Sequence, residues 1–103
     1  MLEDTRRSDA HDERERIRRA LLARRPALAA RLVEGPSGAL TVPVGQGRVI
    51  EVGRMRRLGR ARWVVVEPME EGAKVHEPAG IEDCARIVLA ALARRRMPRA
   101  SAA

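Results

Sequence analysis

Hydrophobic residues in the first third of the chain recur at the spacing of a helix. Four of them share one stripe, with mainly arginine and alanine at the positions between: Ile17, Leu21, Leu28 and Leu32. Ser8 or Asp9 can cap the start, because short polar side chains accept hydrogen bonds from the first free backbone amides. The sequence EGPSG at 34–38 supplies the Gly and Pro that commonly follow a helix. The pattern predicts a helical region that starts near residue 8 and ends by Val33.

Pro26 lies inside this helical pattern. Because proline lacks an amide hydrogen and clashes with the preceding turn, it disrupts the interior of a helix but is tolerated in the first turn. Two interpretations therefore stay open: Pro26 kinks one long helix, or it begins a second, short helix.

The middle of the chain changes from helical spacing to the alternation of polar and apolar residues that is typical of strands. Three segments qualify, with a short fourth: ALTVPV (39–44), RVIEV (48–52), RARWVVVE (60–67) and AKVHE (73–77). Pro43 favours an edge position for the first, because proline cannot donate to a sheet. GQG at 45–47 is a turn, and GRMRRLG at 53–59 is interpreted as a connection.

A last helix is predicted over residues 81–96, with Glu82 and Asp83 at its start and arginines at its end, as the helix dipole favours. The order helix, three or four strands, helix, with short turns, predicts a small single α+β domain. In it, an antiparallel meander carries both helices on one face. We expect the domain to span residues 8–96, with residues 1–7 a disordered leader and residues 97–103 a disordered tail.

Composition adds two points to this picture. Trp63 is the only aromatic residue among 103, so small aliphatic side chains must fill the core, and burial of further apolar surface in a homodimer would stabilise it. The net charge of +7 is concentrated in residues 36–66, where six arginines stand against Glu51 alone. The arginine surplus of this segment is a more specific signal than the charge of the whole chain.

The sequence gives little support for catalysis, so we expect no enzyme, cofactor, metal or small-molecule substrate. Cys84, the only cysteine, lies on the apolar stripe of the last helix and is expected to be a buried packing residue. No nucleophile motif or metal-ligand spacing is present. The longest apolar stretch, IVLAALA at 87–93, is far shorter than the roughly 20 residues of a membrane span. We expect a cytoplasmic protein without membrane contact.

The segment GRMRRLGRAR at 53–62 is the first candidate binding surface. With neighbouring residues it gives this set: Arg48, Arg54, Arg56, Arg57, Arg60, Arg62 and Trp63. These side chains could contact nucleic-acid phosphates, with Trp63 stacking on a base, or an acidic protein partner. They could also be solvated arginines that protect a sheet edge.

The helical stripe is the second candidate. Its residues Ile17, Leu21, Leu28 and Leu32 are spaced by 4, 7 and 4 positions, close to a coiled-coil seam. Leu22, Ala29 and Val33 form a second strip, so one face is available for a partner or a second copy, unless both strips form one wide core face. We expect a non-enzymatic protein-interaction or regulatory module, such as an adaptor, an inhibitor or a chaperone-like protein, that forms a homodimer. The alternative is a nucleic-acid-binding protein that uses the arginine-rich hairpin.

Overall fold

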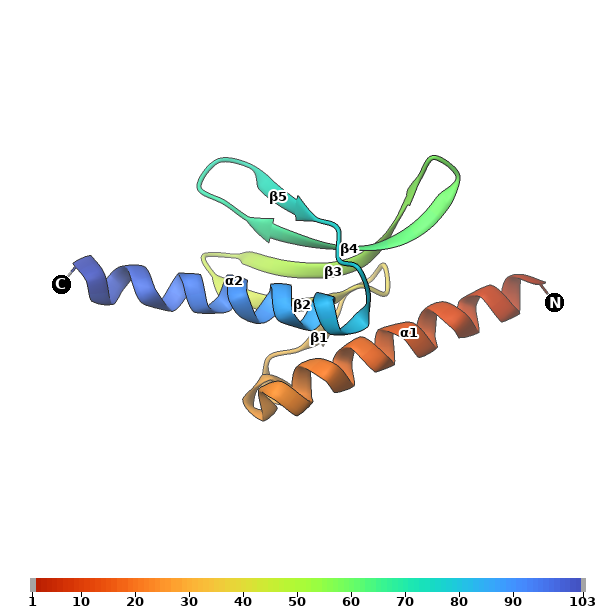
Figure 1. Ribbon diagram of the computed structural model, residues 1–103, viewed down its shortest axis with the longest axis horizontal. Helices are drawn as coiled ribbons and strands as arrows, with labels where there is room; N and C mark the ends of the chain where they lie inside the picture. The colour runs from red at the N-terminus through yellow and green to blue at the C-terminus, as the bar shows by residue number, and fades with distance from the viewer. Residues whose placement is uncertain (1, 103) are drawn as a thin grey trace.

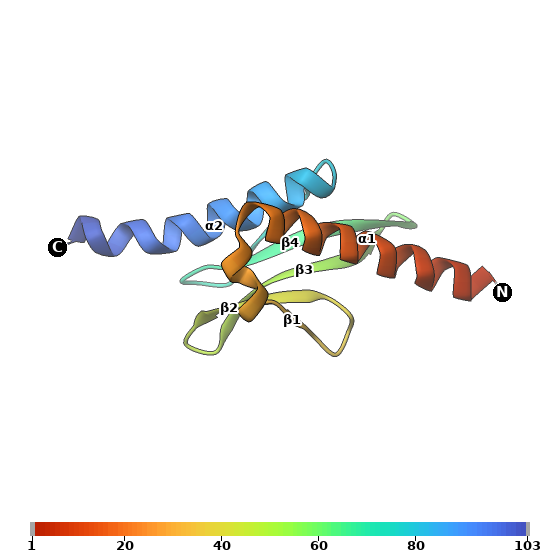
Figure 2. The same cartoon turned by 90° about the horizontal axis from the view of Figure 1, so that it is seen from below.

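A five-stranded antiparallel sheet carries two long helices on one of its faces (Figures 1 and 2). The computed structural model describes the backbone of residues 2–102 and the side chains of residues 10–56 and 58–95. The elements follow in this order: α1 (Leu2–Arg24), the 3-10 helix η1 (Pro26–Ala30), β1 (Val33–Glu34), β2 (Leu40–Gly45), β3 (Arg48–Arg57), β4 (Arg60–Pro68), β5 (Ala73–His76) and α2 (Ile81–Ala102). The predicted α+β class and the helix–strands–helix order are confirmed.

Pro26 begins a separate helix instead of kinking a long one. Helix α1 ends at Arg24, and η1 starts with Pro26 at its first position, where the missing amide hydrogen costs nothing. The amide of Arg25 still donates to the carbonyl of Leu21 at 2.9 Å, so the chain changes direction directly after the last turn of α1. This turn brings Leu28 under the sheet, where it is buried.

Both long helices extend beyond the limits that the sequence predicted. Helix α1 starts at Leu2 instead of near residue 8, and α2 continues through Pro98 to Ala102 instead of ending at 96. Residues 2–7 contain neither Gly nor Pro, so nothing in the local sequence ends a helix there. The segments expected to be a disordered leader and tail are thus helical within the described residues. The limits of the independent domain stay a prediction.

The sheet has one strand more than the three or four predicted. The strands lie in chain order, β1-β2-β3-β4-β5. The extra strand, β1, is only two residues long and pairs with β2 through Val33 with Thr41 and Glu34 with Leu40. The hydroxyl of Thr41 also donates to the carbonyl of Val33 at 2.8 Å. Two residues are too few to produce an alternating pattern, which explains why the sequence did not predict β1.

The segment GRMRRLG is mostly strand, which corrects the prediction of a connection at 53–59. Strand β3 continues to Arg57, and Leu58 and Gly59 alone form the turn to β4. Both turn residues have positive φ, 53° for Leu58 and 77° for Gly59, as a two-residue hairpin turn that follows the twist of the strands requires. The result is a long β3–β4 hairpin whose outer end carries the arginines.

The core lies between the sheet and the two helices. Registered pairs place apolar side chains on this side of the sheet, among them Val42 with Ile50 and Val52 with Val65. They form one cluster with Leu21 of α1 and residues of α2. No described helix combines the length and apolar character needed to cross a membrane.

Candidate functional site

The helical stripe proposed as a partner or dimer face is part of the core of the chain itself. Its four residues are at most 9 % exposed and belong to the core cluster: Ile17, Leu21, Leu28 and Leu32. This corrects the prediction that they bind a partner. The physical reason is that the core is built from small aliphatic side chains, so the apolar stripes of both helices are needed to cover one face of the sheet. Homodimerisation stays a prediction, without this stripe as its surface.

The opposite side of the sheet, here called the outer face, faces away from both helices (Figures 1 and 2). Successive strand residues point to opposite sides, so the neighbours of the core-facing residues belong to the outer face. The cross-strand pairs on this face include Pro43 with Val49, Val66 with Glu51, and Val66 with Val75. Three residues of this face are therefore apolar positions of neighbouring strands β3, β4 and β5: Val49, Val66 and Val75.

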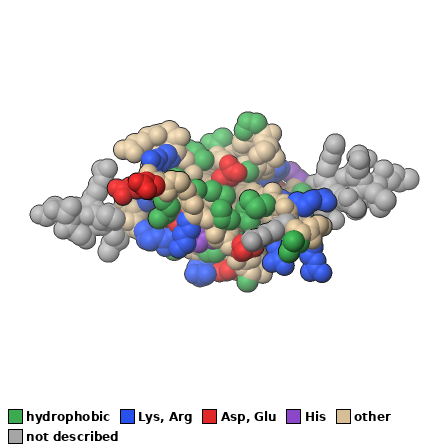
Figure 3. Space-filling model, turned by 90° about the horizontal axis from the view of Figure 1, so that it is seen from above, with side chains coloured by type: hydrophobic (Ala, Val, Ile, Leu, Met, Phe, Trp, Pro, Cys, Tyr) green, Lys and Arg blue, Asp and Glu red, His purple; other side chains and the backbone are tan. Residues whose placement is uncertain are grey.

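The outer face has an apolar middle and a basic end. The side chains of Val49, Met55 and Val75 are hydrophobic but solvent-exposed, with exposed fractions of 37 %, 42 % and 49 %. Toward the hairpin end, Met55 pairs with Arg62, and Arg60 follows two positions away on the same side. Figure 3 shows hydrophobic side chains gathered over the middle of this face and Lys and Arg toward its ends. This combination fits a partner that is both apolar and acidic.

The arginines predicted to form a single patch are divided by the hairpin. Arg60 and Arg62 lie on the outer face, whereas Arg54 and Arg56 alternate toward the helix side. Arg48, at the other end of β3, donates to the carbonyl of Met69 at 2.8 Å. The side chain of Arg57 lies outside the described residues. Among the described side chains of the predicted set, the structure therefore brings together Arg60 and Arg62 on the outer face.

Arg54 and Trp63 form a contact within the chain. The guanidinium carbon of Arg54 lies 5.8 Å from the centroid of the Trp63 ring, a cation–π distance. Nη1 of Arg54 also lies 3.5 Å from Oε1 of Glu13 on α1. Trp63 packs against the core cluster, and its buried Nε1 has no hydrogen-bond partner among the described residues. Arg54 and Trp63 thus connect the hairpin to α1.

Three arginines of the hairpin remain available to a partner. Arg56, Arg60 and Arg62 are exposed, and none of them has an ion pair within the described part of the chain. Exposed guanidinium groups bind carboxylates and phosphates in a two-pronged geometry. The hairpin end can therefore attract an anionic partner without breaking an existing contact.

A second polar centre, which the sequence did not predict, surrounds Glu67. The residue is 4 % exposed, and its Oε1 lies 3.0 Å from Nε2 of His76 and 2.7 Å from Nη2 of Arg94. Burial by itself raises the pKa of Glu67, but the hydrogen bonds and charges of His76 and Arg94 outweigh it and hold the pKa below its ordinary value. Alternation along β4 places Glu67 on the same side as Val65, which faces the core.

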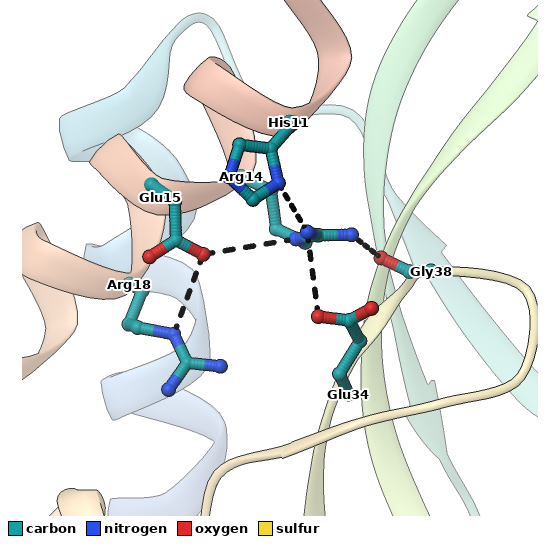
Figure 4. Close-up of polar contacts among 6 residues, drawn as sticks. All are labelled: His11, Arg14, Glu15, Arg18, Glu34 and Gly38. Carbon is teal, nitrogen blue, oxygen red and sulfur yellow. Dashed lines mark hydrogen bonds and ion pairs between the residues drawn. The ribbon is translucent and has the colours of Figure 1, made fainter. Parts of the chain in front are cut away.

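Arg14 joins α1 to the loop between β1 and β2 (Figure 4). Its Nη1 donates to the carbonyl of Gly38 at 3.0 Å, and its Nη2 donates to Nδ1 of His11 at 2.6 Å. The same Nη2 lies 3.3 Å from Oε1 of Glu34 on β1. Arg14 thus connects α1 to β1 and to the β1–β2 loop through both terminal nitrogens of its guanidinium group, whereas its buried Nε has no hydrogen-bond partner among the described residues.

Cys84 is a packing residue, as expected. It is buried in the core, and burial, with a smaller contribution from the charge of Asp83, raises the pKa of its thiol to about 11. The thiol is therefore protonated at neutral pH and is a poor nucleophile. Among the described residues, no group of three or more His, Cys, Asp or Glu side chains could hold a metal ion.

Comparison with known proteins adds no family to this description. No family model, no curated protein and no solved structure matches the chain.

Proposed function

We propose that this protein is a small binding module that holds an acidic protein segment on the outer face of its sheet. The observation that carries the proposal is that the exposed residues Val49 and Val75 and the partly buried Val66 share one face of the sheet with the basic pair Arg60 and Arg62. The proposal assigns no reaction to the protein.

Both parts of the face contribute to such binding in different ways. Covering apolar surface contributes affinity at about 25 cal/mol per Å² before the costs of association are subtracted. Exposed arginines contribute mainly to the rate of encounter and to the selection of an acidic partner. An apolar middle with a basic end therefore favours segments in which acidic and aliphatic residues occur together.

Nucleic acid is the second candidate partner, because the hairpin carries arginines on both of its sides. Arg56 lies on the helix side, and Arg60 and Arg62 lie on the outer face. A two-stranded ribbon fits the major groove of DNA, where both sides of the ribbon approach phosphates. The apolar middle of the outer face has no function in this alternative, so we place it second.

The proposal is tested with a fluorescein-labelled peptide, acetyl-EVEVEVEV-amide, followed by polarisation. The variant Arg60→Glu/Arg62→Glu should weaken binding at least about tenfold, because two attractive charges become repulsive. The matched control is Arg16→Glu/Arg19→Glu, which makes the same change of charge on exposed residues of α1. It should leave affinity within about threefold.

Equal weakening in both double variants would show a nonspecific effect of net charge and would contradict the proposal. No saturable peptide binding by the wild-type protein would do the same. A mixed-sequence DNA duplex is titrated in parallel at several salt concentrations. Tight duplex binding that falls steeply with salt and is lost in Arg60→Glu/Arg62→Glu, without peptide binding, would favour the nucleic-acid candidate.

A further inference from the structure

The β4 strand has a free edge next to the hairpin turn. β3 pairs with β4 as far as Arg60, whereas β5 pairs with β4 only as far as Val65, opposite His76. Residues 60–64 of β4 therefore have a strand neighbour on one side only within the described residues. Figure 1 shows the hairpin continuing past the end of β5. Pro78 explains why β5 stops, because proline has no amide hydrogen for the ladder.

The alternation of an antiparallel pair identifies the backbone groups on this edge. A two-residue turn makes its flanking residues, here Arg57 and Arg60, a hydrogen-bonded pair. The next hydrogen-bonded pair on β4 is then at Arg62, so the amides and carbonyls of Ala61 and Trp63 point away from β3. Outside the sheet pairs, no backbone hydrogen bond in the described residues involves Ala61 or Trp63. Two donors and two acceptors thus form an open edge.

A cavity lies on each side of this edge. One, of about 380 Å³, is lined by Leu58, Arg60, Arg62 and Glu77. The other, of about 310 Å³, lies between α1, β4 and the start of α2, and its apolar lining includes Ile17, Trp63, Ile81 and Cys84. Arg62 lines both cavities, and apart from Arg62 and Glu13 the lining of the second one is apolar or glycine.

We propose that an extended peptide of alternating acidic and aliphatic residues binds here as an added strand beside Ala61 and Trp63 of β4. Alternate side chains of a strand point to opposite sides, so the acidic ones meet Arg60 and Arg62 and the aliphatic ones enter the cavity at Trp63. Main-chain hydrogen bonds supply affinity in this binding mode, and the two cavities supply specificity. The inference rests on the proposed function for its acidic partner and for Arg60 and Arg62, and it places the aliphatic side chains in the cavity at Trp63 instead of over Val49, Val66 and Val75.

The decisive experiment compares two N-methylated forms of acetyl-EVEVEVEV-amide on the unmodified protein. One form is methylated on the valine amides and the other on the glutamate amides. In an added strand, the amides of one residue type point to β4 and those of the other point away. Methylation of one set should weaken binding at least about tenfold, and methylation of the other set should change it less than about threefold. Equal effects would overturn strand addition.

Ala61→Pro is the complementary protein variant. It removes an amide that β3 does not use, and it should weaken the unmethylated peptide at least about tenfold while circular dichroism stays unchanged. A variant with native dichroism and native affinity would overturn the proposal. Arginine-dependent peptide binding with equal effects of both methylations would leave the proposed function intact and reject only the added strand. If the wild-type protein is a dimer and Ala61→Pro converts it to a monomer, the edge binds a second copy of the chain. This result would overturn the proposal of a peptide ligand.

Discussion

Nε2 of His76 lies 3.0 Å from Oε1 of Glu67, and the two residues come from neighbouring strands β4 and β5 on the side of the sheet that faces α2. Arg94 of α2 donates to the same oxygen at 2.7 Å. One buried carboxylate thus connects the sheet to the second half of α2. Burial alone would raise the pKa of Glu67, but the contacts with His76 and Arg94 outweigh burial and lower it.

Glu67→Gln should flatten the acid side of the stability profile. A carboxyl group whose pKa is lower in the folded than in the unfolded state stabilises the fold above the unfolded pKa, and this contribution is lost as pH falls through the folded pKa. The wild-type free energy of unfolding should therefore decrease in that acidic range more steeply than that of Glu67→Gln. Urea unfolding at a series of pH values measures both slopes.

At neutral pH, Glu67→Gln should cost about 1–3 kcal/mol, because a charged hydrogen-bond acceptor is lost from a buried position. The control is Glu82→Gln, which removes an exposed ion pair with Arg24 at 3.0 Å and should cost less than about 1 kcal/mol. If the free energy of unfolding depends on pH in the same way for the wild type and Glu67→Gln, the carboxylate of Glu67 does not have a lowered pKa in the folded protein.

Leu21→Ala should destabilise the monomer by about 2–5 kcal/mol, since the side chain is fully buried in the core. Val75→Ala, on the half-exposed outer face, should cost less than about 1 kcal/mol. Chemical unfolding at two protein concentrations measures both values. If Leu21→Ala lowered the free energy of unfolding strongly only at high protein concentration, Leu21 would lie in a subunit interface and not in the core of the monomer.

Cys84 should react with a thiol reagent only after unfolding. The buried thiol has a pKa raised to about 11, so both access and ionisation oppose the reaction at pH 8. Labelling with a maleimide across a urea gradient should follow the unfolding curve. Stoichiometric labelling in native buffer would show that the α1–α2–sheet core opens readily.

Leu58→Asn should stabilise the protein by about 0.5–1 kcal/mol. Leu58 has a φ of 53° and is 96 % exposed, so it adopts a backbone conformation that suits Asn better and gives up no packing when replaced. Asn followed by Gly is also the preferred pair for this hairpin turn. Thermal unfolding measures the gain, and Leu58→Ala, which keeps the unfavourable φ, should show no comparable increase.

Much of the fold was predictable from local sequence. Alternation in RARWVVVE identified β4, and Glu82 and Asp83 identified the start of the last helix. The sequence allowed Pro26 either to kink one long helix or to begin a second one, and in the structure it begins η1. The end of β3 was predicted wrongly, because Gly53 and the arginines after it resemble a loop in composition.

The binding surfaces were less predictable, because they depend on which side of an element is covered. Ile17, Leu21, Leu28 and Leu32 form the same apolar stripe whether they face the sheet or a partner, and only packing shows that they belong to the core. Similarly, six neighbouring arginines suggest one patch in sequence, but the pleat of the hairpin places Arg56 and Arg62 on opposite sides.

The sequence by itself determined the class of fold, the order of its elements and the concentration of arginine in the middle of the chain, since periodicity, turn residues and charge are local properties. The tertiary structure alone decided which apolar surface stays uncovered and that Glu67 contacts His76 and Arg94. These features depend on contacts between residues far apart in the chain, and no local pattern encodes such contacts.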